Sequence, residues 1–374
     1  MLYIHIPFCR QACHYCNFHF STSLKYEDEM ITALTKEMEM RINFLKSNKL
    51  KSVYLGGGTP SIISIPNVKY LFQAIHKIFE IEDKAEITLE ANPEDISIDK
   101  LKAWMDVGVN RLSLGVQSFH DRDLEWMNRA HDSTAVTKAI ELISDTNLEY
   151  SLDLIFGTPG TTHKMWRSNL YRAIDLRPSH ISAYALTVEN KTALHTMIKK
   201  GHEKESPPEL IREQFYLADE LLTAAGYQHY EISNYALPGK HAVHNSKYWS
   251  SQEYLGIGPS AHSYNGNLRS WNVASNGQYL SFMSGKRNPS THEELSSLDK
   301  INEYLMTRLR TAKGINADDW KDRFDESLRK EPEQVLQQKI ASGEIILSDG
   351  HYILSKDSLF IADSVISDLF AVED

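Results

Sequence analysis

The stretch that decides the fold is residues 3–18, with the sequence YIHIPFCRQACHYCNF. It holds all three cysteines of the 374-residue chain, Cys9, Cys13 and Cys16, in the spacing C-x3-C-x2-C. Thiolates are the usual ligands of iron–sulfur clusters, and a cubane with four irons normally takes four of them. Three thiolates therefore predict a [4Fe–4S] cluster in which one iron keeps an open position for a substrate or cofactor.

Two other uses of the thiols stay open at this point. A tetrahedral zinc site would need a fourth protein ligand, and the local candidates are His5, His14 and His19. Burial as small hydrophobic residues is the other use, but it does not explain three cysteines within eight residues. A disulfide framework is not expected, because an odd count leaves one thiol without a partner. The cluster is the favoured interpretation.

The cysteine spacing resembles the signature of the radical S-adenosylmethionine (SAM) superfamily. The Y-x-H-I-P-F-C run ending at Cys9 narrows the resemblance to the branch of HemN, the oxygen-independent coproporphyrinogen dehydrogenase, and the HemW haem chaperones. This resemblance covers nearly the whole chain, including YEISNYA at 230–236 and LGIG at 255–258. It implies that SAM chelates the open iron, where an electron from the cluster can cleave it to methionine and a 5′-deoxyadenosyl radical.

Two departures separate this chain from HemN. That enzyme carries a fourth cysteine two residues after the third, and here the position is Phe18. It also has a longer segment before its cluster loop, whereas only eight residues precede Cys9. Both departures match the HemW pattern, which implies a haem chaperone with no catalytic residue assigned. The alternatives are a coproporphyrinogen III dehydrogenase, a HemN-like methyltransferase and, less favoured, a zinc-stabilised binding protein.

The composition excludes several broad classes. Apolar residues make up 41% of the chain, which is enough for a continuous core, and the formal net charge of −10 argues against a general nucleic-acid binder. No apolar run approaches the ~18 residues that a membrane span needs. The N-terminus lacks the basic-then-apolar layout of a signal peptide. We therefore expect a cytoplasmic protein, where thiols and an oxygen-sensitive cluster stay reduced.

Short apolar runs typical of strands alternate with segments in which apolar residues recur at helical spacing. Strands are predicted at residues 2–6, 52–55, 86–90, 111–115, 151–156 and 180–186. Helices are predicted over residues 25–48, 66–79, 97–107, 121–129, 133–145 and 164–175. Six strand-then-helix units predict an α/β fold with a parallel sheet.

Spacing alone leaves an open doubly wound sheet and a barrel in competition, and the resemblance implies a partial (β/α)6 radical SAM barrel. Both architectures place ligands at the carboxyl ends of the strands. We expect the barrel over residues 1–225 and an extension over 226–290, which is rich in Tyr, Asn, Gly, His and Trp. Residues 291–374 predict a mainly helical, winged-helix-like domain with a β-hairpin at Asp349-Gly350.

A glycine-rich turn follows the second predicted strand, with the sequence GGGTP at residues 56–60. It lacks the lysine of a phosphate loop and does not fit G-x-G-x-x-G. From the residues alone, a tight turn and a cradle for a ligand are about equally supported. The resemblance implies that Gly57, Gly58 and Thr59 contact SAM, with backbone carbonyls meeting its amino group.

Polar residues lie at or near the ends of the later strands. Glu90 could accept hydrogen bonds from ribose hydroxyls, and Arg129 could clamp a carboxylate with its planar fork. Asp153 interrupts an apolar strand, so it needs either a site role or a structural partner. A solvated strand end is the ordinary alternative for Glu90. The resemblance implies SAM contacts at Tyr3, Glu90, Gln117, Arg129 and Asp153, with Tyr15 near the adenine.

The most distinctive stretch of the second half is HNSKYW at residues 244–249. Its chemistry alone favours a satisfied histidine beside core aromatics over a haem ligand. It resembles the His-Asn-x-x-Tyr-Trp motif of HemW-like proteins, which implies haem contact with His244 as axial ligand and His229 and His262 as rivals. The resemblance further implies haem-acceptor proteins, including membrane-bound ones, as partners, and allows a flavodoxin- or ferredoxin-like electron donor and a homodimer.

Overall fold

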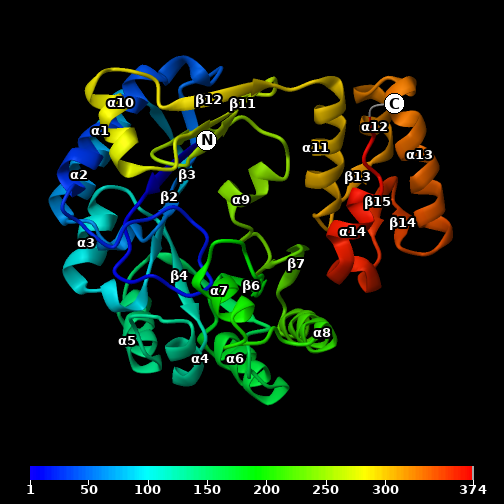
Figure 1. Ribbon diagram of the computed structural model, residues 1–374, viewed down its shortest axis with the longest axis horizontal. Helices are drawn as coiled ribbons and strands as arrows, with labels where there is room; N and C mark the ends of the chain where they lie inside the picture. Colours follow the sequence, from blue (N-terminus) through cyan, green and yellow to red (C-terminus); the bar gives the residue numbers. More distant parts are fainter. Residues whose placement is uncertain (373–374) are drawn as a thin grey trace.

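The structure, a computed structural model, describes residues 1–372 and is built on one large sheet with the order β7-β8-β6-β5-β4-β3-β2-β1-β9 (Figure 1). Its six central strands are parallel and follow the order of the chain. They are β1 (Leu2–Ile6), β2 (Lys49–Gly57), β3 (Glu80–Ala91), β4 (Arg111–Gln117), β5 (Glu149–Phe156) and β6 (His180–Ala185). The predicted series of six strands is thereby confirmed.

Three short strands extend this sheet at its two edges. Parallel to β1 runs β9 (Leu255–Ile257), while β8 (Asn234–Ala236) is antiparallel to β6 and β7 (Gln228–Glu231) is antiparallel to β8. In residues 1–372 the edge strands β7 and β9 do not pair with each other, so the barrel is partial and open. Strands of three or four residues are too short to show a periodic pattern in the sequence.

Helices follow the central strands and cover the outer face of the sheet. They are α1 (Glu27–Met40), α2 (Ile65–Ile78), α3 (Ile98–Asp106), α4 (Asp121–Trp126), α5 (Ser133–Ser144), α6 (His163–Leu176), α7 (Ala193–Lys199) and α8 (Pro208–Ala224). The helix predicted over residues 25–48 is too long. Arg41 leaves helical geometry at φ −108° and ψ 14°, and a 3₁₀ turn at Ile42–Phe44 leads to β2.

The two faces of the central strands differ in polarity, and this difference positions the site. Leu55, Leu89 and Leu152 are fully buried on the outer face, in the main hydrophobic core. Side chains of the alternate positions, such as Glu90 and Asp153, face a cavity inside the curved sheet. Because strands in parallel sheets are usually apolar on both faces, a polar inner face indicates a ligand site.

Residues after β8 form elements beside the barrel. The helix α9 (Val243–Tyr248) packs against β2, and α10 (Asn276–Ser284) packs against α1. A small antiparallel sheet contains β10 (His262–Tyr264), β11 (Leu268–Asn272) and β12 (Ser290–Glu294).

The C-terminal part lies to one side of the barrel with a core of its own (Figure 1). Its helices are α11 (Ser297–Leu309), α12 (Ala317–Arg323), α13 (Glu326–Ala341) and α14 (Ala362–Ser367), and its sheet contains β13 (Ile315–Asn316), β14 (Ile345–Ser348) and β15 (His351–Leu354). The predicted hairpin is confirmed, since Asp349 and Gly350 join β14 to β15 with φ of 48° and 74°. Across residues 1–372, no helix is both long and apolar enough for a transmembrane segment.

Candidate functional site

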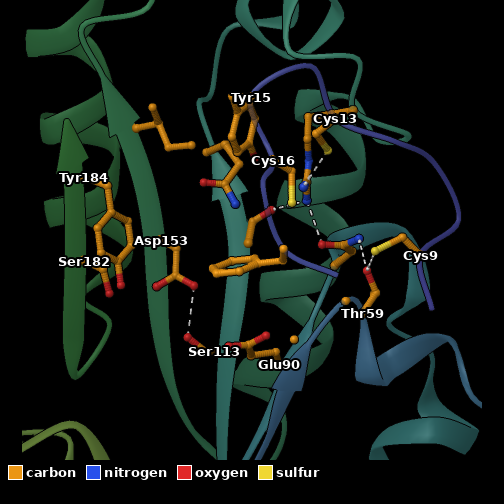
Figure 2. A pocket seen from close by; sticks show the side chains of 18 of the residues that line it. Cys9, Cys13, Tyr15, Cys16, Thr59, Glu90, Ser113, Asp153, Ser182 and Tyr184 are labelled. Atoms are coloured by element: carbon orange, nitrogen blue, oxygen red, sulfur yellow. Dashed lines mark hydrogen bonds between the residues drawn. The ribbon is translucent and has the colours of Figure 1, made fainter. Parts of the chain in front are cut away.

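A cavity of about 460 Å³ lies inside the sheet, under the cysteine loop (Figure 2). Its volume is in the range of small-molecule sites. Most of the residues predicted for cluster and SAM binding line it: Cys9, Cys13, Tyr15, Cys16, Gly57, Gly58, Thr59, Glu90, Gln117, Arg129 and Asp153. Tyr3 is instead packed against Tyr54, with 6.1 Å between the ring centroids, and its hydroxyl lies 3.2 Å from His5 Nδ1.

The cysteine loop is held in place by backbone hydrogen bonds to distant segments. Cys9 N donates to Ser21 O at 3.0 Å, which closes the base of the loop. His14 N donates to Met127 O at 3.1 Å, and His14 O accepts from Leu194 N at 2.8 Å. The loop is therefore pinned between the end of α4 and the start of α7, so its three thiols face the cavity.

The donor set fits a cluster better than a single zinc ion. Within residues 1–372, no group of three or more His, Cys, Asp or Glu side chains is arranged around one metal position. A cubane binds each thiolate at a different iron, so its ligands lie farther apart than those of one zinc ion. Of the candidate fourth zinc ligands, His5 has both ring nitrogens in contacts, with Nε2 2.8 Å from His19 O and Nδ1 3.2 Å from the Tyr3 hydroxyl. His14 and His19 each use one ring nitrogen, at 2.7 Å from Trp126 O and from Asn276 Oδ1.

Two of the cysteine sulfurs accept hydrogen bonds that are linked through Asn92. Arg129 donates to Cys13 Sγ at 3.4 Å and to Asn92 Oδ1 at 2.7 Å. Asn92 Nδ2 donates in turn to Thr59 Oγ1 at 3.4 Å, which leaves the Thr59 hydroxyl proton for Cys9 Sγ at 3.5 Å. The hydrogen bonds of Arg129, Asn92 and Thr59 thus form a series in which the final donors face the sulfurs of Cys13 and Cys9. Such bonds stabilise the negative charge of a thiolate and orient the cysteine as a ligand.

The glycine turn is required by close packing against β1 and the cysteine loop. Gly57 has a φ of +103°, and a Cβ there would lie 2.4 Å from His5 Nδ1. A Cβ on Gly58 would lie 2.5 Å from Phe8 O. Gly58 N donates to Ile6 O at 2.9 Å, which ties the turn to the end of β1. The tight-turn role is thus present in the structure, and SAM contact at these glycines stays a prediction.

Burial changes the acidity of the two carboxyl groups in the cavity. It raises the pKa of Glu90 to about 7, although Tyr54 donates a hydrogen bond of 2.7 Å to the carboxylate. It also raises the pKa of Asp153, whose Oδ2 accepts from Ser113 Oγ at 3.0 Å (Figure 2). Asp153 Oδ1 is buried with no hydrogen-bond partner among residues 1–372. Unpaired buried oxygens are costly, so this atom is available for a ligand.

Arg129 and Gln117 line the cavity near the carboxyl end of β4. Arg129 Nη2 also donates to Gly115 O at 2.9 Å, while its Nε is buried without a partner in residues 1–372. A fixed guanidinium with one unused donor suits a carboxylate. Gln117 has a φ of 66°, which is uncommon for a residue other than glycine, and it follows an irregularity in the pairing of β4 with β5. Both features are typical of binding sites.

His244 is placed differently from the other predicted residues. It is 1% exposed, with Nδ1 3.0 Å from Ser52 Oγ and Nε2 3.1 Å from the Tyr248 hydroxyl. Burial lowers the pKa of His244 to about 3, so the ring is neutral. Neither nitrogen is free for iron in this conformation, and the axial-ligand prediction stays untested. Its neighbour Asn245 does line the cavity.

The two rival histidines lie outside the cavity. Both ring nitrogens of His229 have partners: Nδ1 lies 3.0 Å from Asp219 Oδ1, and Nε2 lies 3.1 Å from Ile232 O. His262 faces outward on β10 near the ring of Trp271. Neither of them lines the cavity.

Sequence reasoning missed several cavity residues. These are Asn92, Arg111, Ser113, His180, Ser182 and Tyr184. A signal existed for most of them, because His180, Ser182 and Tyr184 alternate along β6, as do Arg111 and Ser113 along β4. Such alternation places side chains on one face of a strand.

Comparisons with known proteins agree with this geometry. The family model of the radical SAM superfamily matches residues 3–170, and that of the HemN C-terminal domain matches residues 295–360. The fold resembles the solved structure of Escherichia coli HemN, a coproporphyrinogen III oxidase described as a radical SAM enzyme. The TM-score is 0.86 at 21% identity, covering 99% of this chain and 89% of that one, and the likeness concerns the fold.

Relatives of known name cover most of the chain. The sequence is 35% identical over 368 residues to the "Heme chaperone HemW" of Bacillus subtilis (strain 168), covering 97% of both chains. It is 35% identical over 323 residues to the protein of the same name in Escherichia coli (strain K12), covering 83% of this chain and 82% of that one. The chain belongs to the HemW family of radical SAM proteins.

Proposed function

We propose that this protein is a haem chaperone that binds haem and a SAM-chelated [4Fe–4S] cluster and delivers the haem to acceptor proteins. The observation that carries the proposal is the similarity to a relative named a heme chaperone, at 35% identity over 97% of both chains. The cavity supports the cofactor part, because three thiols, two hydrogen-bond donors to sulfur and two buried carboxyl groups face one space.

The residues of this chain would hold the cofactors in distinct ways. Cys9, Cys13 and Cys16 would each bind one iron. Arg129 Nε would pair with the carboxylate of SAM, and Glu90 would accept from its ribose hydroxyls. When bound, the cluster can supply one electron at a time at an iron that no cysteine occupies.

A decarboxylase is the second candidate, supported by the fold that the chain shares with HemN. The residue at position 18 favours the chaperone over the decarboxylase. The resemblance to HemN implies a cysteine at this position, whereas this chain has Phe18, which lines the cavity and is 66% exposed. An exposed phenyl ring there can contact an apolar ligand or partner but supplies no ligand to iron.

The partners are proposed on the same basis. Haem is the cargo, proteins that accept haem are the recipients, and an electron donor and a homodimer remain part of the hypothesis. The cytoplasmic location expected from composition also stays a prediction.

The test is a haem titration of the anaerobically reconstituted protein, followed by absorption, with coproporphyrinogen III and SAM assayed in parallel. We expect stoichiometric haem binding and no decarboxylation. Decarboxylation that consumes SAM in proportion, with 5′-deoxyadenosine as product, would identify an enzyme instead and remove the chaperone proposal.

A further inference from the structure

A buried guanidinium lies at the floor of the cavity without a close partner. Arg111 is the first residue of β4 and is 4% exposed, and its Nη2 has no hydrogen-bond partner among residues 1–372. The nearest carboxylate is that of Glu86, 4.0 Å from Arg111 Nε. Glu86 already accepts hydrogen bonds of 2.8 Å from the backbone N–H groups of Val243 and His244. An arginine is rarely buried without bonded oxygens, so this one needs an acceptor.

A second unused group lines the same part of the cavity. His180 is the first residue of β6 and is 1% exposed, with its Nε2 2.8 Å from the Tyr230 hydroxyl. Its Nδ1 is buried with no partner in the described part of the chain. Burial keeps the pKa of His180 well below its usual range, so the ring is neutral. If Nε2 accepts from Tyr230, Nδ1 carries the proton and becomes a second donor toward the cavity.

Arg111 lies at the opposite end of β4 from the residues predicted to hold the carboxylate of SAM. It begins the strand, whereas Gln117 ends it and Arg129 contacts Gly115 near that end. His180 is level with Glu90 in the sheet, through Ser151 and Ser113. The distance along a strand from Arg111 to Gln117 is about 20 Å at the usual rise per residue. Arg129 bonds Gly115 O, about 13 Å along β4 from Arg111, so a SAM carboxylate held by Arg129 leaves Arg111 in need of a second acceptor.

We propose that Arg111 and His180 form a carboxylate site at the floor of the cavity, and that a propionate of haem occupies it. The choice of haem rests on the proposed function. A planar guanidinium and an N–H donor match the two oxygens of a carboxylate. A phosphate would bring more negative charge beside Glu86 and Asp153.

The HNSKYW segment connects this floor to haem. Asn245 of that segment lines the cavity together with Arg111, and the backbone of His244 is held by Glu86, the carboxylate nearest to Arg111. A haem that contacts the motif would therefore have a propionate within the same region.

The test compares two probes, haem and haem dimethyl ester, in which both carboxylates are methylated. Dissociation constants are measured for both in wild type, Arg111→Gln and Arg111→Lys. Arg167→Gln is the matched control, because Arg167 is exposed on α6 and outside the cavity. SAM binding is measured in each variant to show that the barrel is folded.

We expect wild type to bind haem at least about tenfold more tightly than the ester, as a charge-assisted bond predicts. Arg111→Gln loses this preference and keeps its affinity for the ester, Arg111→Lys retains part of it, and the control is unchanged. If Arg111→Gln does not fold, His180→Phe serves as a second variant, with a smaller loss of preference.

Three results would overturn the inference alone: equal affinities for both probes in wild type, equal weakening of both in Arg111→Gln, or a loss of SAM binding in place of haem binding. A wild-type chain that binds SAM but neither porphyrin would overturn the proposed function as well, so the two failures are distinguishable.

Discussion

The cysteine loop and the helix α9 are both marked by short motifs, but the structure uses their side chains in opposite ways. The loop is pinned by backbone hydrogen bonds, so the sulfurs of Cys9, Cys13 and Cys16 are left to face the cavity. In α9, the side chain of His244 is itself the anchor, with both nitrogens engaged in a buried contact. A motif identifies the chemistry of a segment, but available lone pairs decide what the segment can bind.

Further contacts hold α9 in place against β2. The carboxylate of Glu86 accepts from two N–H groups at the start of α9, where the free N–H groups of a helix favour negative charge. The ring of His244 lies 5.1 Å from that of Tyr54, which in turn bonds Glu90. Ligation of haem by His244 would have to break one hydrogen bond in this cluster. Four experiments test the contrast between the loop and α9.

The largest effect is expected at the loop. Cys13→Ser should abolish the stable cubane, because a hydroxyl is a poor replacement for a thiolate on iron. Iron and sulfide per chain are measured after anaerobic reconstitution, with Ala12→Ser as the control in the same loop. Unchanged iron and sulfide in Cys13→Ser would refute the ligand assignment.

The second effect concerns His244. His244→Ala removes two buried hydrogen bonds and leaves a cavity, so the free energy of unfolding should fall by about 2–4 kcal/mol. Denaturant titration measures this, and Tyr248→Phe, which removes only one of the bonds, should lose less. The haem spectrum of the folded variant tests the ligand prediction: an axial role requires a shifted Soret band and weaker binding, and an unaltered spectrum and affinity would exclude it.

The third effect is a pH dependence set by Glu90. Its pKa is about 7 in the folded chain and ordinarily 4.5, so between these values the unfolded chain loses a proton that the folded chain keeps. The contribution of Glu90 to the stability of the cofactor-free protein should therefore be fully present below pH 4.5 and be lost as the pH rises to about 7, a change of no more than about 3 kcal/mol. Glu90→Gln should flatten this slope, and the exposed Glu220→Gln should not; equal slopes in all three proteins would contradict the prediction.

The smallest effect is expected from the hydrogen bonds to sulfur. With Asn92→Asp, the Thr59 hydroxyl would donate to the new carboxylate and no longer to Cys9, so the reduced cluster should lose stabilisation and its reduction potential should become more negative. An EPR-monitored redox titration measures the potential while iron content stays unchanged. Thr59→Val should act in the same direction and Thr59→Ser should not, and a potential unmoved by both Asn92→Asp and Thr59→Val would show that the chain of bonds has no influence.

The repeating part of the fold could be predicted because its pattern is local. Apolar strands such as 151–156 and amphipathic helices such as 164–175 each carry their own periodicity, and both were found within one or two residues of their limits. The edge strands β7, β8 and β9 could not be predicted, since each contains only three or four residues, and β8 and β9 pair with the distant strands β6 and β1. The end of α1 at Met40 was missed because Arg41 is held by contacts with distant residues, including Ser263 and Ser270.

By itself, the sequence determined the order of elements, the cysteine triad and the side chains at the strand ends, because spacing along the chain is enough to place these. Only the tertiary structure decided which polar atoms remain without partners. It satisfied both nitrogens of His244 and left Arg111 Nη2 and His180 Nδ1 unpaired within the described residues. The physical reason is that a buried polar atom is satisfied or left available by neighbours that folding brings to it, such as Ser52 at His244 and Tyr230 at His180, and no local pattern records those neighbours.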